Sequence, residues 1–184
     1  NTFIGIDSGK DNIQGNSNTF LGGKAGNSNT DGGFNTFLGE HAGYNNTEGN
    51  GNTFLGFNTG IACSSGNFNT LLGHTAGTNI TTGSNNNIIG DFGGFITTTG
   101  ENNVFIGGDA GASTNTFSNT VALGYLATAS APSKVRIGNS SISVIEGQVD
   151  WTFPSDARFK YNVEDEGIPG LAFISRLRPV TYQF

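Results

Sequence analysis

Few side chains of this chain have the types and spacing that chemistry requires. The two histidines, His41 and His74, occupy neighbouring positions of a seventeen-residue repeat, two repeats apart, and do not recur in the repeat between them, so we expect neither a metal nor a cofactor. The single cysteine, Cys63, has no partner for an internal disulfide and is interpreted as a small buried side chain. Glycoside hydrolysis needs a placed pair of carboxylates, and no such pair stands out. The sequence predicts no substrate-directed enzyme in these residues.

The composition favours short strands and tight turns over helices. Thirty of the 184 residues are glycine, only 12% are charged and none is methionine. No run of about 18 apolar residues occurs, so we expect no membrane insertion. The chain opens at Asn1 inside a recurring motif, and we therefore interpret it as a fragment of a longer protein.

The charge distribution argues against nucleic acid as a partner. The net charge is −6, and residues 1–131 hold only Lys10 and Lys24 as cations. Binding to phosphate backbones requires a basic stripe, which this region lacks. We expect no nucleic-acid binding.

A repeat of seventeen residues organises residues 1–131. The motif N-T-F-L/I-G or a close variant starts at Asn1, Asn18, Asn35, Asn52, Asn69, Asn86 and Asn103, and a degenerate copy starts at Thr120. Glycines recur at three positions of the unit, represented by Gly39, Gly43 and Gly49 in the third copy. Each glycine is expected at a corner that needs a positive φ or has no room for a Cβ atom. The segments between corners are long enough for strands but too short for helices.

These features predict an all-β fold, a parallel β-solenoid with eight 17-residue rungs over residues 1–131. Each strand stacks on its copy in the next rung, at roughly 4.8 Å per rung. Asn46, in a polar stretch between corner glycines, is expected in an exposed turn.

Two neighbouring columns of apolar residues run through the repeats. The third position of the motif is mostly Phe and the fourth is Ile or Leu, as in Phe37 and Leu38. Adjacent strand residues point to opposite faces, so one column fills the interior and the other stands outside. Such an external ladder exceeds the apolar patch of ordinary monomers and predicts self-association around an axis. The alternative places both columns inside one wide solenoid with a bent strand.

The repeats resemble the head repeats of trimeric autotransporter adhesins, through the N-T-F-L-G units followed by A-G, as in Ala25-Gly26 and Ala42-Gly43. The resemblance covers about residues 1–131. It implies a left-handed parallel β-roll in which three chains associate, and similar repeats occur in phage tail fibres. Those heads have about fourteen residues per turn, so the seventeen-residue unit leaves the cross-section open.

Residues 132–154 are expected to form a short β stem or connector. From Lys134 to Phe153, polar and apolar residues alternate in a pattern of short strands that ends at Pro154.

Residues 155–184 resemble the opening of the intramolecular chaperone domain of endosialidase tailspikes. The resemblance rests on S-D-A-R-F-K at 155–160 and L-R-P-V-T-Y at 177–182, with a predicted helix between them. It implies the beginning of an α+β domain that folds as a trimer and drives assembly of the upstream fibre.

In many members of that chaperone family the domain then cuts itself off beside the signature serine. The resemblance makes Ser155 the nucleophile, next to Asp156, and Lys160 the general base, provided that burial or charge lowers the pKa of the lysine. The alternative is structural, with Ser155 and Asp156 as a helix or turn cap and Lys160 on the surface. The sequence leaves open whether this chain is cleaved.

The sequence therefore favours an extracellular structural or adhesive fibre on a phage, an injection machine or a bacterial surface. Its expected partners are two further copies of itself and a cell-surface glycan or host receptor. A glycan-degrading tailspike is the first alternative, with its active site outside this fragment. An ice-binding solenoid is a distant alternative, suggested by the ladder that begins Thr2, Thr19, Thr36 and broken by Asn87 and Val104.

Overall fold

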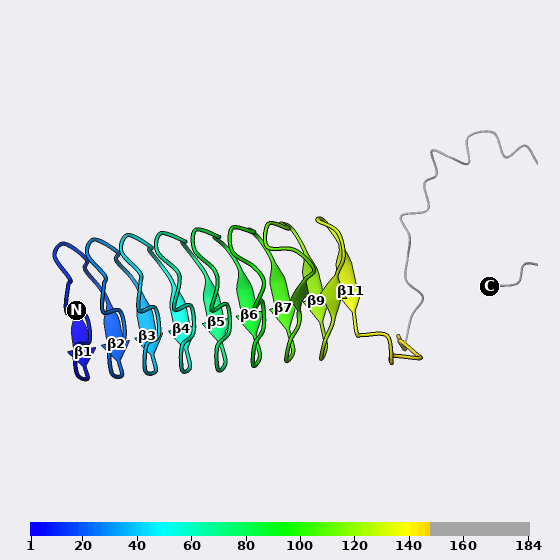
Figure 1. Cartoon of the computed structure of the whole chain (residues 1–184), viewed down its shortest axis with the longest axis horizontal. Helices are drawn as coiled ribbons and strands as arrows, with labels where there is room; N and C mark the ends of the chain where they lie inside the picture. Colours follow the sequence, from blue (N-terminus) through cyan, green and yellow to red (C-terminus); the bar gives the residue numbers. More distant parts are fainter. Residues whose placement is uncertain (148–184) are drawn as a thin grey trace, which may run out of the picture. The chain divides into compact units, whose positions relative to one another are not determined.

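The computed structural model describes residues 1–147, and in them the chain is an all-β parallel β-solenoid with 17-residue rungs (Figure 1). The chain divides into two units, Asn1–Ser143 and Val144–Phe184, and the solenoid lies in the first. Its strands are β1 (Thr2–Ile4), β2 (Thr19–Leu21), β3 (Thr36–Leu38), β4 (Thr53–Leu55), β5 (Thr70–Leu72), β6 (Asn87–Ile89), β7 (Val104–Ile106), β8 (Gly111–Ala112), β9 (Val121–Leu123), β10 (Thr128–Ala129) and β11 (Val135–Ile137). The described residues contain no helix, and therefore none that could cross a membrane.

One parallel sheet contains nine of these strands, in the order β1-β2-β3-β4-β5-β6-β7-β9-β11. Equivalent positions of successive repeats pair, so Thr36 lies opposite Thr53 and Phe37 opposite Phe54. The strands therefore stack in chain order, from the blue β1 to the yellow β11 in Figure 1. We number the rungs 1 to 8 from Asn1 and count the first residue of each motif as position 1.

The coil changes slightly in its last rungs. Gly111 and Ala112 form β8, which pairs in parallel with β10 in a second, two-stranded sheet. β11 pairs with β9, and only fourteen residues separate Val121 from its partner Val135. The alternating pattern from Lys134 onward predicts a strand in this segment, and the structure joins that strand to the solenoid sheet.

Position 3 fills the interior of the coil. Phe20, Phe37 and Phe54 are fully buried, and consecutive rings stack with centroids 4.8 Å apart. The column continues with Leu71, Ile88, Phe105 and Ala122, all fully buried. Small residues at position 8, such as Ala42, complete this core. The expectation that one apolar column fills the interior is confirmed.

The recurring glycines have the two roles expected of them. Gly39 has a φ of 135°, in the region that favours glycine, and a Cβ atom there would meet the carbonyl oxygen of Gly56 at 2.4 Å. Gly32 has an ordinary φ, but an added Cβ would lie 2.5 Å from the carbonyl oxygen of Gly49 in the next rung. Neighbouring rungs therefore approach too closely for any side chain at these corners.

A column of asparagines at position 1 ties the rungs together inside the coil. The Oδ1 atom of Asn35 accepts a hydrogen bond from the backbone N–H of Asn52, at 2.9 Å. The Nδ2 group of Asn35 donates to the carbonyl oxygen of Gly49, at 2.7 Å. The same pattern recurs from Asn1 to Asn103. Buried amides are stable here because their donors and acceptors are satisfied by the neighbouring turns.

The structure shows that the prediction for Asn46 is wrong. Asn46 is fully buried rather than in an exposed turn, and its Nδ2 group donates to Oδ1 of Asn29 at 2.6 Å and to the carbonyl oxygen of Gly49 at 3.1 Å. Its column, position 12, continues with the buried Cys63 and Ile80. The amide ladder ends at Cys63, and Oδ1 of Asn46 has no hydrogen-bond partner among the described residues.

Candidate functional site

The outer face of the long sheet carries an exposed apolar column. We call it the outer column, and it consists of the position 4 residues Ile4, Leu21, Leu38, Leu55, Leu72, Ile89, Ile106 and Leu123. The exposed fraction is 58% at Ile4, 45% at Leu21 and 42% at Ile89. The alternative in which both apolar columns lie inside one wide solenoid is therefore wrong.

Position 2 shares this face. The threonines of β1 to β4 are exposed beside the outer column, and Thr70 is half-buried. In β6 and β7 this position is occupied by Asn87 and Val104, which have no hydroxyl group. The face is thus a strip of alternating apolar and small polar side chains that runs along the sheet.

A second surface feature lies at the corner after the strand. Aromatic and histidine rings of rungs 3 to 6 follow one another there, and we call them the aromatic row: His41, Tyr44, Phe57, His74, Phe92 and Phe95. The rings of Phe57 and His74 are stacked with centroids 5.6 Å apart. Phe92 meets His74 edge-on at 5.5 Å, and Phe95 lies 5.8 Å from Phe92.

The histidines have local partners, and the described residues hold no group of three or more metal-ligating side chains. The Nδ1 atom of His74 lies 2.7 Å from Oδ1 of Asp91 in the next rung. Both side chains are more than half exposed. An exposed pair of this kind contributes roughly 0.2–1 kcal/mol, so it adds little to the stability of the stack.

Cys63 lies in the interior, as expected. Its side chain is fully buried and its thiol is free. Burial raises the pKa of Cys63 from 9.0 to about 12, while a hydrogen bond to the backbone of Gly66 acts in the opposite direction. A protonated buried thiol is a poor nucleophile, so Cys63 is a structural side chain.

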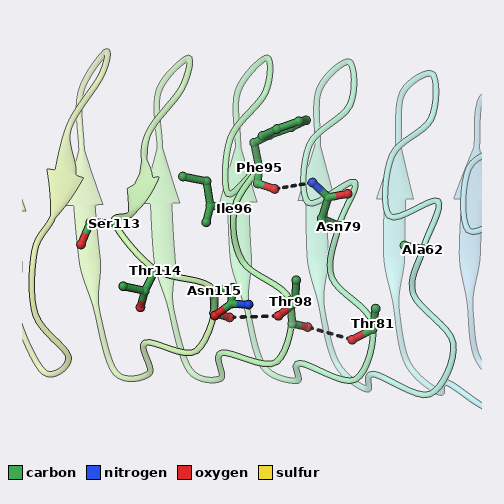
Figure 2. Close-up of a pocket in the computed structure, with 9 residues that line it drawn as sticks. All are labelled: Ala62, Asn79, Thr81, Phe95, Ile96, Thr98, Ser113, Thr114 and Asn115. Atoms are coloured by element: carbon green, nitrogen blue, oxygen red, sulfur yellow. Dashed lines mark hydrogen bonds between the residues drawn. The ribbon is translucent and has the colours of Figure 1, made fainter.

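An open groove of about 690 Å³ crosses rungs 4 to 7 (Figure 2). Its wall in rungs 4 and 5 is formed by Ala62, Asn79 and Thr81. Rung 6 contributes Phe95, Ile96 and Thr98, and rung 7 contributes residues 113–115. Asn79 donates a hydrogen bond to the carbonyl oxygen of Phe95 at 2.7 Å. All the lining residues occupy positions 10 to 13 of their rungs, whereas the outer column occupies position 4.

The candidate catalytic residues lie elsewhere. Ser155, Asp156 and Lys160 fall outside the residues that the structure describes, as does the helix expected between 168 and 177. Their roles stay predictions.

The fold defines the class of this protein as a parallel β-solenoid of about eight 17-residue rungs. Comparison of the chain with family models, with curated proteins and with solved structures found no match in any of the three.

The groove and the aromatic row are the features that the sequence analysis missed. The signal was present at position 6, where Phe57, His74 and Asp91 follow one another in successive rungs. Residues at one position of successive rungs stack on one another, so this column places the three side chains side by side. One end of the groove lies in rung 7, and the spacing of the motif does not reveal the change of path there.

Proposed function

We propose that the chain is a segment of an extracellular fibre, structural or adhesive, in which three identical chains associate side by side along the solenoid axis. The observation that carries the proposal is the outer column, which places an Ile or Leu at position 4 of all eight rungs, exposed in five of them and half-buried at Leu38, Leu72 and Leu123.

The physical reason is that the small burial free energy of one Ile or Leu is repeated in each rung and adds up along the stack. Fully burying a Leu or Ile side chain contributes roughly 1.5–3 kcal/mol relative to leaving it in water. The column is already half-buried at Leu38, Leu72 and Leu123, so each residue gains only part of that amount. A ring of identical chains gives every rung the same partner surface, and a cyclic arrangement closes without leaving a free apolar face.

The number three and the extracellular location come from the resemblances described under Sequence analysis. The adhesin-like repeats imply trimers on a bacterial surface, a phage or an injection machine. The chaperone-like segment from Ser155 implies a domain that assembles the trimer and can then cut itself off. Both inferences concern the intact protein.

Two alternatives have weaker support. A glycan-degrading tailspike would have its active site outside this fragment, and no feature of the described residues points to one. An ice-binding solenoid would use the exposed threonines of β1 to β4, but these share their face with the outer column and the ladder breaks at Asn87 and Val104.

Mass photometry of the intact protein over a dilution series tests the proposal. The expected result is one species with three times the mass of the chain, which persists at nanomolar concentration. A stable monomer would contradict it. Measurement of thermal hysteresis on the same sample tests the ice-binding alternative, for which the fibre proposal expects no effect.

A further inference from the structure

The groove across rungs 4 to 7 ends at rung 7, which follows a different path from the rungs before it. In rungs 1 to 6 the position 9 glycine has a left-handed φ, for example 64° at Gly94, and starts a tight turn. The N–H of Thr97 closes that turn on the carbonyl oxygen of Gly94 at 2.9 Å. In rung 7 the equivalent Gly111 is extended in β8 instead. Asn115 remains paired with rung 6, where its carbonyl oxygen accepts from the N–H of Thr98, and Ser113 and Thr114 lie beside Ile96 along the groove (Figure 2).

Several polar groups in the groove are free to bind a ligand. Within residues 1–147, the hydroxyls of Ser113 and Thr114 and the side-chain amide of Asn115 make no hydrogen bond, and all three residues are exposed. The hydroxyls of Thr81 and Thr98 donate to the backbone carbonyls of Thr98 and Asn115, both at 3.3 Å. Their oxygen lone pairs are left as acceptors. The groove thus offers donors and acceptors along its length.

An aromatic ring stands at the edge of these polar groups. Phe95 lines the groove with 47% of its surface exposed, and its ring continues the aromatic row through Phe92 and His74. The electron-rich face of such a ring attracts the slightly positive C–H groups of a ligand. Pyranose sugars present both kinds of group, hydroxyls at their edge and C–H groups on their face.

The charges around the groove restrict the ligand further. No charged side chain lines it, and the sequence contains neither Lys nor Arg between Lys24 and Lys134. Three carboxylates, Asp91, Glu101 and Asp109, lie in rungs 6 and 7, although none of them lines the groove. An anionic ligand would find no counter-charge and would meet a negative field. Sulfated or uronic glycans and nucleic acids are disfavoured for this reason.

A peptide strand is disfavoured because the backbone of the groove is already paired. The N–H of Thr81 donates to the carbonyl oxygen of Thr98, and the N–H of Thr98 donates to that of Asn115, both at 2.9 Å. Addition of a strand needs a free edge of backbone donors and acceptors, which this wall lacks.

We propose that the groove between Asn79, Phe95 and Asn115 is a binding site for a neutral oligosaccharide. The sugar lies along the solenoid axis, with one ring against Phe95 and its hydroxyls on the free groups of residues 113–115. Rungs about 4.8 Å apart give rungs 4 to 7 a span of about 15 Å, enough for a few sugar units. The inference names a partner class for the adhesive role proposed above and rests on it, although the site itself lies on one chain.

Saturation-transfer NMR and titration calorimetry on the full chain test this proposal. The probes are four neutral hexasaccharides, maltohexaose, cellohexaose, mannohexaose and N-acetylchitohexaose, with hexagalacturonate as the acidic comparison. At least one neutral probe is expected to bind, and hexagalacturonate is expected to bind more weakly. The variant F95A should weaken binding roughly tenfold, because the stacked ring contact is lost.

The matched control is F34A, which removes an equally large ring that is 69% exposed at position 17 and does not line the groove. It should bind as the wild type does. Failure of every neutral probe to bind the wild type would overturn the proposal, as would unchanged affinity in F95A or a preference for hexagalacturonate. Mass photometry of the intact protein separates the two proposals. A trimer that binds no sugar would support the fibre proposal and contradict the glycan site. A monomer that binds sugar would support the glycan site and contradict the fibre proposal.

Discussion

The side chains of Asn29 and Asn46 are joined inside the coil, with Nδ2 of Asn46 donating to Oδ1 of Asn29 at 2.6 Å. Asn46 also donates to the carbonyl oxygen of Gly49, so its amide group has acceptors on both sides. The neighbouring Asn45 is exposed, and none of its side-chain atoms makes a hydrogen bond within residues 1–147. Two adjacent asparagines therefore have opposite environments.

This contrast predicts that N46D is strongly destabilising and that N45D is not. At position 46 the substitution replaces a donor by an oxygen that faces two acceptors, and it buries a charge that has no partner. The expected loss is several kcal/mol for N46D and within about 0.5 kcal/mol for N45D. Thermal unfolding followed by circular dichroism measures both, and equal behaviour of the two variants would contradict the assigned environments.

The loss in N46D should also depend on pH. Burial raises the pKa of the introduced carboxyl above its unfolded value of about 3.9, so the folded state prefers the protonated form. Stability then falls as pH rises above the unfolded pKa and is recovered below it. The difference in melting temperature between N46D and the wild type should be smaller at pH 3 than at pH 7.

The two apolar columns predict different failures for F37D and L38D. Phe37 is fully buried, so a carboxylate there disrupts the core and the chain should lose its β-type circular dichroism spectrum. Leu38 is half-buried on the outer face, so L38D should keep the fold but prevent assembly. Mass photometry and circular dichroism on both variants separate the outcomes. A trimeric L38D protein would show that the outer column is not the interface.

Because Cys63 is buried, we expect its thiol to react only after the chain unfolds. With its pKa raised from 9.0 to about 12, the thiolate fraction at pH 8 falls roughly 1000-fold, and burial blocks access as well. Iodoacetamide should label the unfolded chain at an ordinary rate and the native chain at least about 100-fold more slowly. Rapid labelling of the native chain would mean that rung 4 opens readily.

The same thiol should make stability fall in alkaline solution. Below pH 9.0 both states hold the proton and there is no effect, whereas between pH 9.0 and about 12 only the unfolded state ionises. Stability should then decline by about 1.4 kcal/mol per pH unit from this group. The variant C63A isolates the effect, because it lacks this part of the decline while all other groups titrate as before.

The chaperone-like segment carries the last prediction. If Ser155 is an active nucleophile, the intact wild-type protein should appear as two fragments produced by cleavage beside this residue. S155A should stay uncut. K160A should slow cleavage about 100-fold or more, since a positioned base is lost. Neither variant should lose the trimer, because assembly depends on packing. Denaturing gels of boiled and unboiled samples report both properties, and an uncut wild type would leave Ser155 and Lys160 without a catalytic role.

The period, the corner glycines and the inward direction of Phe37 could be predicted from the sequence. Each follows from a rule that repeats in every rung, so a stack can satisfy it in only a few ways. The outward direction of Leu38 followed as well, because neighbouring residues of a strand face opposite sides.

The burial of Asn46 could not be predicted from the polarity of its own segment. An asparagine in a stretch rich in Asn and Thr suggests a solvated loop, and its hydrogen-bond partner lies one full rung away in Asn29. The column gave the better signal, because Cys63 and Ile80 occupy the same position in later rungs. The extended conformation of Gly111, which changes the path of rung 7 at one end of the groove, is not determined by the sequence pattern.

The ladder at position 12 changes its chemistry partway along the coil, from the amides of Asn29 and Asn46 to the thiol of Cys63 and the side chain of Ile80. Each rung contacts only its neighbours, so the stability of the coil is close to a sum of rung and interface contributions. The unpaired Oδ1 of Asn46 lies at the junction between rungs 3 and 4. Across this junction the buried side-chain amide contact is made at position 1 alone, where Oδ1 of Asn35 accepts from the backbone N–H of Asn52.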